Sequence, residues 1–161
     1  MSVRVIATSV LGGLVGGLLG AGVMSVAHTL VSKREPPPAT AAGDDATVKV
    51  ADRVSRVVRG RPLAEREKSS AGSAVHYGFG AGLGALYGVV AGVVPSLGAG
   101  WGLLFGIAAW LGPHAIVVPA LGLAPSPLAS PLGKEAVEFV LHLLYGSTVE
   151  VVRRSAVRIA R

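Results

Sequence analysis

Four polar side chains recur on one stretch near the C-terminus, and their types could support acid–base chemistry or ligand binding. They follow at spacings of three, four and three residues: Glu135, Glu138, His142 and Tyr145. In an α-helix these positions fall within an arc of roughly 80°, which predicts one ionisable face. Because an ionisable group in hydrocarbon is costly unless it is paired or hydrated, this face should point into a helix bundle or a water-filled cavity.

Further residues are candidate partners of this face, so the sequence predicts a buried polar cluster. His76 opens one apolar run, and His114 lies beside a helix-breaking proline in another. Glu150 lies near the opposite end of the C-terminal stretch, where Arg153 or Arg154 could pair with it.

Three uses of this cluster remain open at this point. As a structural core, hydrogen bonds between His and Glu would hold helix register, at about 1 kcal/mol each. As a proton or ion path, Glu138 and His142 have suitable chemistry, because burial moves the pKa values of such groups toward neutrality. As a metal site, Glu138 and His142 at i, i+4 could share a divalent ion with His76 or His114.

No catalytic motif accompanies the cluster. Ser96, Ser126 and Ser130 lie in Gly/Pro-rich turns, but no G-x-S-x-G elbow surrounds them. The chain has no cysteine, which excludes disulfides and thiolate nucleophiles. We therefore expect neither enzymatic activity nor a bound cofactor.

The elements that must position these residues are apolar helices. Hydrophobic residues make up 51% of the 161 residues and charged residues only 15%, and none of Asp, Glu, Lys or Arg occurs between Val5 and Ser32 or between Ala71 and Gly133. Since roughly 20 apolar residues cross a bilayer as a helix, the sequence predicts an all-α integral membrane bundle of about four transmembrane helices. The expected spans are Val5–Val31, Ser73–Val94, Trp101–Leu121 and Gly133–Val152.

The corresponding regions are a first transmembrane helix (1–32), a Pro/Ala/Arg-rich linker with an amphipathic helix (33–70), a three-helix membrane core (71–154) and a basic tail (155–161). A retained first span is favoured over a signal peptide because its apolar run is too long, although Ser25-Val26-Ala27 resembles a cleavage site. A kink is expected near His114, between Pro113 and Pro119.

The region between the first two spans begins with the turn-rich Pro36–Pro38 and then regains helical periodicity. One arc of the predicted short helix carries Val50, Ala51, Val54, Val57 and Val58, and the opposite arc carries Lys49, Asp52, Arg53 and Arg56. Such a helix lies on the membrane surface with its basic face toward anionic head groups, or packs against the bundle.

Glycines recur every fourth residue inside the apolar runs, a pattern resembling a glycine zipper. They are Gly12, Gly16 and Gly20, then Gly80, Gly84, Gly88 and Gly92, and finally Gly98, Gly102 and Gly106. Small residues at this spacing let helix backbones approach closely. The pattern predicts packing within one bundle, with homo-oligomerisation as the alternative.

The distribution of charge favours membrane lipid over nucleic acid as a partner. The formal net charge is +6, but the basic residues flank apolar spans. Nine Lys and Arg residues lie in 33–70 and four after Val152. The positive-inside rule would place each of these two segments in the cytoplasm, although four spans put them on opposite sides of the membrane. We expect both termini in the cytoplasm.

The sequence resembles the YagU-like family of small bacterial inner-membrane proteins, over roughly Gly72 to Arg154. The resemblance rests on three blocks: His76-Tyr77-Gly78-Phe79-Gly80 with Leu86-Tyr87-Gly88; then Phe105-Gly106, Trp110, His114, Pro119 and Gly122-Leu123; then Glu135, Glu138, His142, Tyr145-Gly146, Glu150 and Arg153-Arg154. The region between the first two spans departs from that family. The resemblance implies a multi-span inner-membrane protein and supplies no catalytic or binding residues.

These observations predict a bacterial inner-membrane protein of structural or stress-related role. A small proton or ion transporter or channel component that uses Glu138 and His142 is the alternative.

Overall fold

The structure is a computed structural model that describes residues 3–33 and 45–160, and every element in these ranges is helical, as the sequence predicts. The elements are α1 (Val3–Ser32), α2 (Ala46–Arg59), α3 (Glu65–Val93), the 3-10 helix η1 (Pro95–Gly100), α4 (Leu103–Ala109), the π-helix η2 (Trp110–Val117), α5 (Val118–Ala120), the 3-10 helix η3 (Pro127–Ala129) and α6 (Leu132–Ile159). The predicted linker at Pro36–Pro38 lies outside the described residues.

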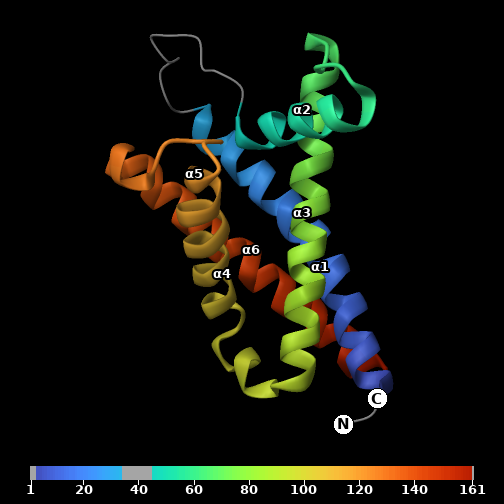
Figure 1. Cartoon of the computed structure of the whole chain (residues 1–161). Coiled ribbons are helices and arrows are strands. Elements are labelled where there is room, and N and C mark those ends of the chain that lie inside the picture. The colour runs from blue at the N-terminus through green and yellow to red at the C-terminus, as the bar shows by residue number, and fades with distance from the viewer. Residues whose placement is uncertain (1–2, 34–44, 161) are drawn as a thin grey trace.

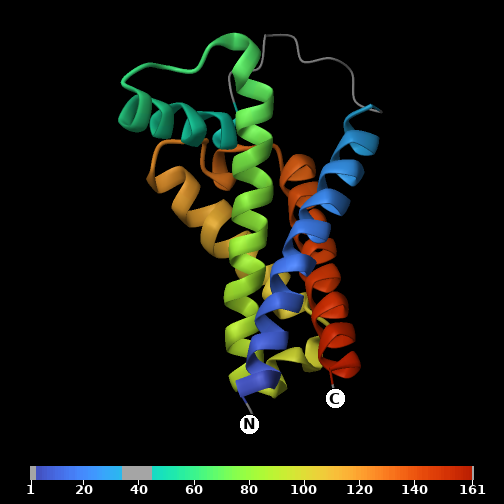
Figure 2. The same cartoon turned by 90° about the vertical axis from the view of Figure 1, so that its right-hand side faces the viewer.

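The long helices run in alternating directions along the bundle: α1, α3, the α4–η2–α5 segment and α6 (Figure 1). Within it, α1 packs against both α3 and α6, while α4 packs against α6. The short helix α2 packs on α3 and lies across one end of the bundle (Figure 2). The first turn of α1 and the last turn of α6 lie together at the other end.

Three helical stretches of the described chain are long and apolar enough to cross a membrane: α1, α3 and Leu103–Ala120. This count of three differs from the predicted number of about four. The fourth predicted span exists as α6, a helix of 28 residues. α6 is less apolar than the other three because charged residues recur along it, among them Glu138, Glu150 and Arg153.

Two helices are longer than predicted. α3 begins at Glu65 rather than near Ser73, because the Glu67 carboxylate accepts a hydrogen bond from the backbone N–H of Ala64 (2.8 Å) and caps the first turn. α6 continues through Ile159, so the predicted basic tail is helical to that residue.

The third apolar run contains the predicted distortion, in the form of a π-helix. Pro113 lies inside η2, where it cannot donate a backbone hydrogen bond. The helix widens to a π-helical turn where this bond is missing. π-helical turns occur often at functional sites. As a result, His114 lies on a widened turn rather than on a regular α-helix.

α2 is present as predicted, but it packs on α3 through a different arc. Val48, Ala51 and Ser55 are buried. Val54 and Val57, on the predicted apolar arc, remain exposed. The contact surface of α2 therefore lies between the predicted apolar arc and the arc of charged residues, and it shares only Ala51 with the predicted apolar arc.

Glycines allow α1 to approach two helices at once. Gly12, Gly16 and Gly20 face α6, and a Cβ added at Gly16 would lie only 2.9 Å from the Val149 backbone. A second row that the sequence analysis missed, Gly13 and Gly17, faces α3, where its partners are Gly80, Gly84 and Gly88. The predicted ladders on α1 and α3 are thus used within the chain, as closely approaching backbones require.

The start of α4 approaches α6 through glycines as well. A Cβ at Gly102 or Gly106 would overlap the backbone of α6, at Gly146 and His142 respectively. Gly102 also has φ +81°, a left-handed conformation that side chains with a Cβ rarely adopt. Gly146, which the ladder pattern missed, is the matching small residue on α6.

The first prediction concerns this close packing. We expect Gly84→Ala to destabilise the bundle by about 1–3 kcal/mol, because the new methyl group overlaps the backbone of α1 at Gly13 and Gly17. Gly82 on the same helix has no neighbouring atom within 4 Å. Gly82→Ala is therefore the matched control and should be neutral or slightly stabilising. Thermal unfolding in detergent measures both, and equal effects would contradict the assigned helix faces.

Candidate functional site

α6 carries two separate polar groups of residues, one toward each of its ends. The predicted single cluster is therefore divided. The histidine–carboxylate cluster contains His28, His114, Glu135, Glu138 and His142, whereas the predicted member His76 bonds instead to a backbone carbonyl of α1. The carboxylate–arginine cluster contains Ser9, Tyr87, Glu150, Arg153 and Arg154.

The histidine–carboxylate cluster joins α6 to two other elements. His114 Nε2 on the π-helix lies 3.1 Å from Glu135 Oε2. His28 Nε2 on α1 lies 3.6 Å from Glu138 Oε1, with the His28 side chain 54% exposed and the Glu138 side chain 16% exposed. Each carboxylate therefore has a histidine partner from a different helix.

Two further histidines donate hydrogen bonds to backbone carbonyls. His142 Nδ1 donates to the Glu138 carbonyl at 2.7 Å, which leaves Nε2 of a neutral ring as an acceptor. The His142 and His114 rings lie 5.3 Å apart. His76 Nε2 donates to the Ala21 carbonyl at 3.2 Å and thereby ties α3 to α1. Each of the four histidines of the chain thus has a polar partner in the bundle.

The metal-site hypothesis gains no geometric support. Within the described ranges, no group of three or more His, Asp or Glu side chains is arranged to hold a metal ion. Glu138 and His142 do not converge on one point, because the His142 ring is turned to the backbone carbonyl of Glu138.

The carboxylate–arginine cluster has a fully buried carboxylate at its centre. Glu150 Oε1 accepts from Arg153 Nη2 at 2.8 Å and from Arg154 Nε at 2.5 Å. Glu150 Oε2 accepts from Arg153 Nε at 2.6 Å and from the Tyr87 hydroxyl at 2.9 Å. Each carboxylate oxygen accepts two hydrogen bonds. Such bonds offset the cost of burying an ionised group.

Hydrogen bonds from this carboxylate extend to the neighbouring elements. Arg153 Nη1 donates to Ser9 Oγ on α1 (3.1 Å), and Ser9 Oγ donates to the Gly88 carbonyl on α3 (2.7 Å). Arg154 Nη2 donates to the Gly98 carbonyl of η1. The cluster therefore connects α1, α3, η1 and α6 through one continuous set of bonds.

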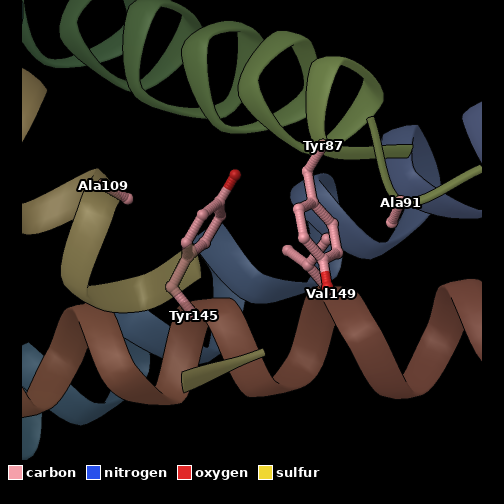
Figure 3. Packing of buried hydrophobic residues seen from close by; sticks show 5 residues of the cluster. All are labelled: Tyr87, Ala91, Ala109, Tyr145 and Val149. Atoms are coloured by element: carbon pink, nitrogen blue, oxygen red, sulfur yellow. The ribbon is translucent and has the colours of Figure 1, made fainter. Parts of the chain in front are cut away.

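Tyr145, predicted as part of the ionisable face, lies between the two clusters. It points from α6 toward α3, whereas Tyr87 points from α3 toward α6 beside Val149 (Figure 3). The Tyr145 hydroxyl donates to the Gly80 carbonyl at 2.7 Å. Each tyrosine thus extends across the gap between α3 and α6 and donates a hydrogen bond on the far side.

Sequence reasoning missed three members of these clusters: His28, Tyr87 and Ser9. Ser9 and His28 are polar residues within an apolar span, and this was an available signal, because polar groups at membrane depth need partners. Tyr87 gave no such signal, since tyrosines also serve as interface anchors.

Basic residues of α2 hold it to the end of the bundle. Lys49 Nζ donates to the Leu123 carbonyl at 2.7 Å, and Arg53 Nη2 donates to the Leu121 carbonyl at 3.1 Å. These two residues therefore bond to the protein, as the packing alternative in the sequence analysis allows.

Asp52 fixes the segment that follows α2. The Arg56 side chain donates to it, and so does the backbone N–H of Leu63 at 2.8 Å. These two hydrogen bonds, the Arg56 bond first, lower the pKa of Asp52 below its ordinary value. The stability that Asp52 contributes is present above its unfolded pKa and is lost as the pH falls through its folded pKa.

Comparison with known proteins places more than half of the chain in one family. Residues 61–151 match the family described as Protein of unknown function (DUF1440). This match agrees with the resemblance to the YagU-like family. No curated protein and no solved structure matches the chain. The matched range contains Tyr87, Glu135, Glu138 and Glu150, while Ser9 and the two arginines of the second cluster lie outside it.

The second prediction tests the buried carboxylate. Glu150→Gln should destabilise the protein by about 3 kcal/mol, because the two arginines lose the charge that compensates them. Glu65→Gln is the matched control: Glu65 is exposed and pairs only with Lys68 among the described contacts, so its loss should cost under about 1 kcal/mol. The measurement is thermal unfolding in detergent. Equal effects of the two substitutions would show that the cluster does not stabilise the fold.

Proposed function

Because the chain belongs to the DUF1440 family, a family of unknown function, we propose a role from its own structure. We propose that it is a multi-pass protein of the bacterial inner membrane with a structural role. Its two polar clusters hold the transmembrane helices in a fixed arrangement.

The observation that carries this proposal is the saturation of Glu150. A carboxylate that must bind or release protons or ions needs a free oxygen or access to water. Glu150 is fully buried, and both of its oxygens accept hydrogen bonds from protein donors. Such a group supports a structural role, because removing any partner leaves a buried charge unpaired.

The proposal also makes α6 the fourth membrane pass, despite its charges. α6 runs alongside the three apolar stretches (Figure 1). Its buried ionisable residues Glu135, Glu150 and Arg153 are all paired within the bundle. Paired charges that face the interior of a bundle are the form in which membrane proteins accept ionisable residues.

The third prediction tests this topology with single-cysteine variants, which report cleanly because the chain has no cysteine. Val57→Cys lies on α2 and Ser155→Cys near the end of α6, and both positions are exposed. A membrane-impermeant maleimide should label the two from opposite sides of the membrane. If the termini are cytoplasmic, as the sequence predicts, Val57→Cys reacts in intact spheroplasts and Ser155→Cys only after permeabilisation.

Labelling of both positions from the same side would contradict four membrane passes. Recovery of the unmodified protein in the soluble fraction without detergent would contradict the membrane assignment as a whole. The cysteine-free wild type is the control for background labelling.

A second candidate function is proton or ion conduction past Glu138 and His142. One observation favours it: the Glu138–His28 pair is looser than the Glu150 cluster, at 3.6 Å, and its histidine is half-exposed. The His28 ring is therefore only partly covered by protein, unlike the Glu150 carboxylate. Paired Glu and His residues at membrane depth are the usual components of proton relays.

The fourth prediction separates the two functions. Under a pH gradient, liposomes holding the wild-type protein should show the same proton and cation flux as empty liposomes, and Glu138→Gln should not change it. Flux that is present in the wild type, is lost in Glu138→Gln and is kept in Glu65→Gln would instead establish conduction and overturn the purely structural role.

A further inference from the structure

An apolar groove runs along the outside of the bundle between α3 and α4. Its volume is about 270 Å³, and its walls include Leu86 and Val90 from α3, Leu97 from η1, and Leu104 and Ala108 from α4. Almost all of its lining is apolar. From Leu83 to Val90 the α3 side extends about 10 Å, given 1.5 Å per helical residue.

The floor of this groove connects to the carboxylate–arginine cluster. Tyr87 and Phe105 line the groove, and their rings stack with centroids 4.2 Å apart. On the inner side, the Tyr87 hydroxyl donates to Glu150. The groove and the charged cluster are therefore adjacent, separated by one layer of aromatic side chains.

The cluster carries an uncompensated positive charge at the η1 end of the groove. One carboxylate, Glu150, faces two guanidinium groups, Arg153 and Arg154, which leaves a net charge of one. Arg153 is buried, whereas the Arg154 side chain is 25% exposed. The excess charge is therefore accessible at Arg154.

The Arg154 guanidinium also has a further hydrogen-bond donor. Its Nε donates to Glu150 and its Nη2 to Gly98, while Nη1 has no hydrogen-bond partner among the described residues. Its guanidinium lies 4.5 Å from the centroid of the exposed Trp101 ring. Gly98, which it contacts, is next to the groove residue Leu97. An anion held by Arg154 would lie at the mouth of the groove.

We propose that this groove and Arg154 form a binding site for one anionic phospholipid of the surrounding bilayer. Its acyl chain lies along the groove between α3 and α4, and its phosphate accepts hydrogen bonds from Arg154 Nη1. Exposed tryptophan beside an arginine at the end of a helix bundle is suited to the head-group region of a membrane. The inference rests on the membrane-spanning bundle proposed above and adds a ligand to it.

Charge complementarity favours an anionic lipid over a zwitterionic one. A neutral head group carries its own cation, which would meet the net positive charge of the cluster. Phosphatidylglycerol has no such cation and compensates the charge that Glu150 leaves unmatched. The groove alone would accept the chain of any lipid, so the selectivity lies in Arg154.

The experiment compares the Tm of the purified full-length protein in detergent with added phosphatidylglycerol or phosphatidylcholine. A ligand that binds only the folded state raises the Tm in proportion to its saturation. We expect phosphatidylglycerol to raise the wild-type Tm by about 5 °C more than phosphatidylcholine does. Native mass spectrometry should show one retained phosphatidylglycerol molecule.

Two variants should abolish the difference between the lipids. Ala108→Phe fills the groove from an exposed position and leaves the charged cluster intact. Arg154→Gln removes the accessible charge. If Arg154→Gln does not fold, Ala108→Phe still tests the site.

The matched controls are Ala7→Phe, on an exposed position of α1 outside the groove, and Arg158→Gln, which removes an exposed positive charge of the same helix. Both should keep the wild-type response. Equal Tm shifts from the two lipids, or a full response in Ala108→Phe, would overturn the site. Neither result affects the maleimide labelling, so failure of the lipid site is distinguishable from failure of the membrane assignment.

Discussion

The buried carboxylate of Glu150 is the constraint on which the arrangement of the other helices depends. An ionised group in an apolar bundle must receive hydrogen bonds on both oxygens or else lose its charge. Glu150 obtains them from α3 through Tyr87 and from two arginines on its own helix. These arginines need further acceptors, which Ser9 and Gly98 supply. One charge thus determines which helices must meet at this level of the bundle.

The glycine rows are the steric counterpart of that electrostatic constraint. The hydrogen bond between Ser9 and the Gly88 carbonyl requires the backbones of α1 and α3 to approach closely. Gly88 permits this approach, since a Cβ there would overlap the α1 backbone at Ser9. In a bilayer, where apolar side chains gain little by leaving lipid, close backbone packing and polar bonds are the terms that remain to hold helices together. Here both terms act at the same residues.

The sequence predicted the class of fold and the polar face of α6 because both depend on spacing along one helix. It named His114 as a candidate partner of that face, and His114 lies 3.1 Å from Glu135, but it did not identify His28 or Tyr87, because helical spacing says nothing about which helix lies opposite. The division into two clusters has the same origin: α6 is long enough that Glu138 and Glu150 face different neighbours. The sequence left open whether α2 packs against the bundle, and it could not show that Val48, Ala51 and Ser55 form the contact, because that depends on the position of α3.

The two clusters differ in how far the protein covers their ionisable groups. Glu150 is fully buried, whereas His28 of the Glu138–His28 pair is half-exposed. α2 lies at the end of the bundle where α1 ends (Figure 2), and His28 belongs to the last turns of α1. There Lys49 and Arg53 bind the carbonyls that follow α5, and α5 directly continues the π-helix that carries His114. α2 is therefore bonded to the segment that follows the π-helix of His114, whereas the carboxylate–arginine cluster bonds the helices toward the other end of the bundle.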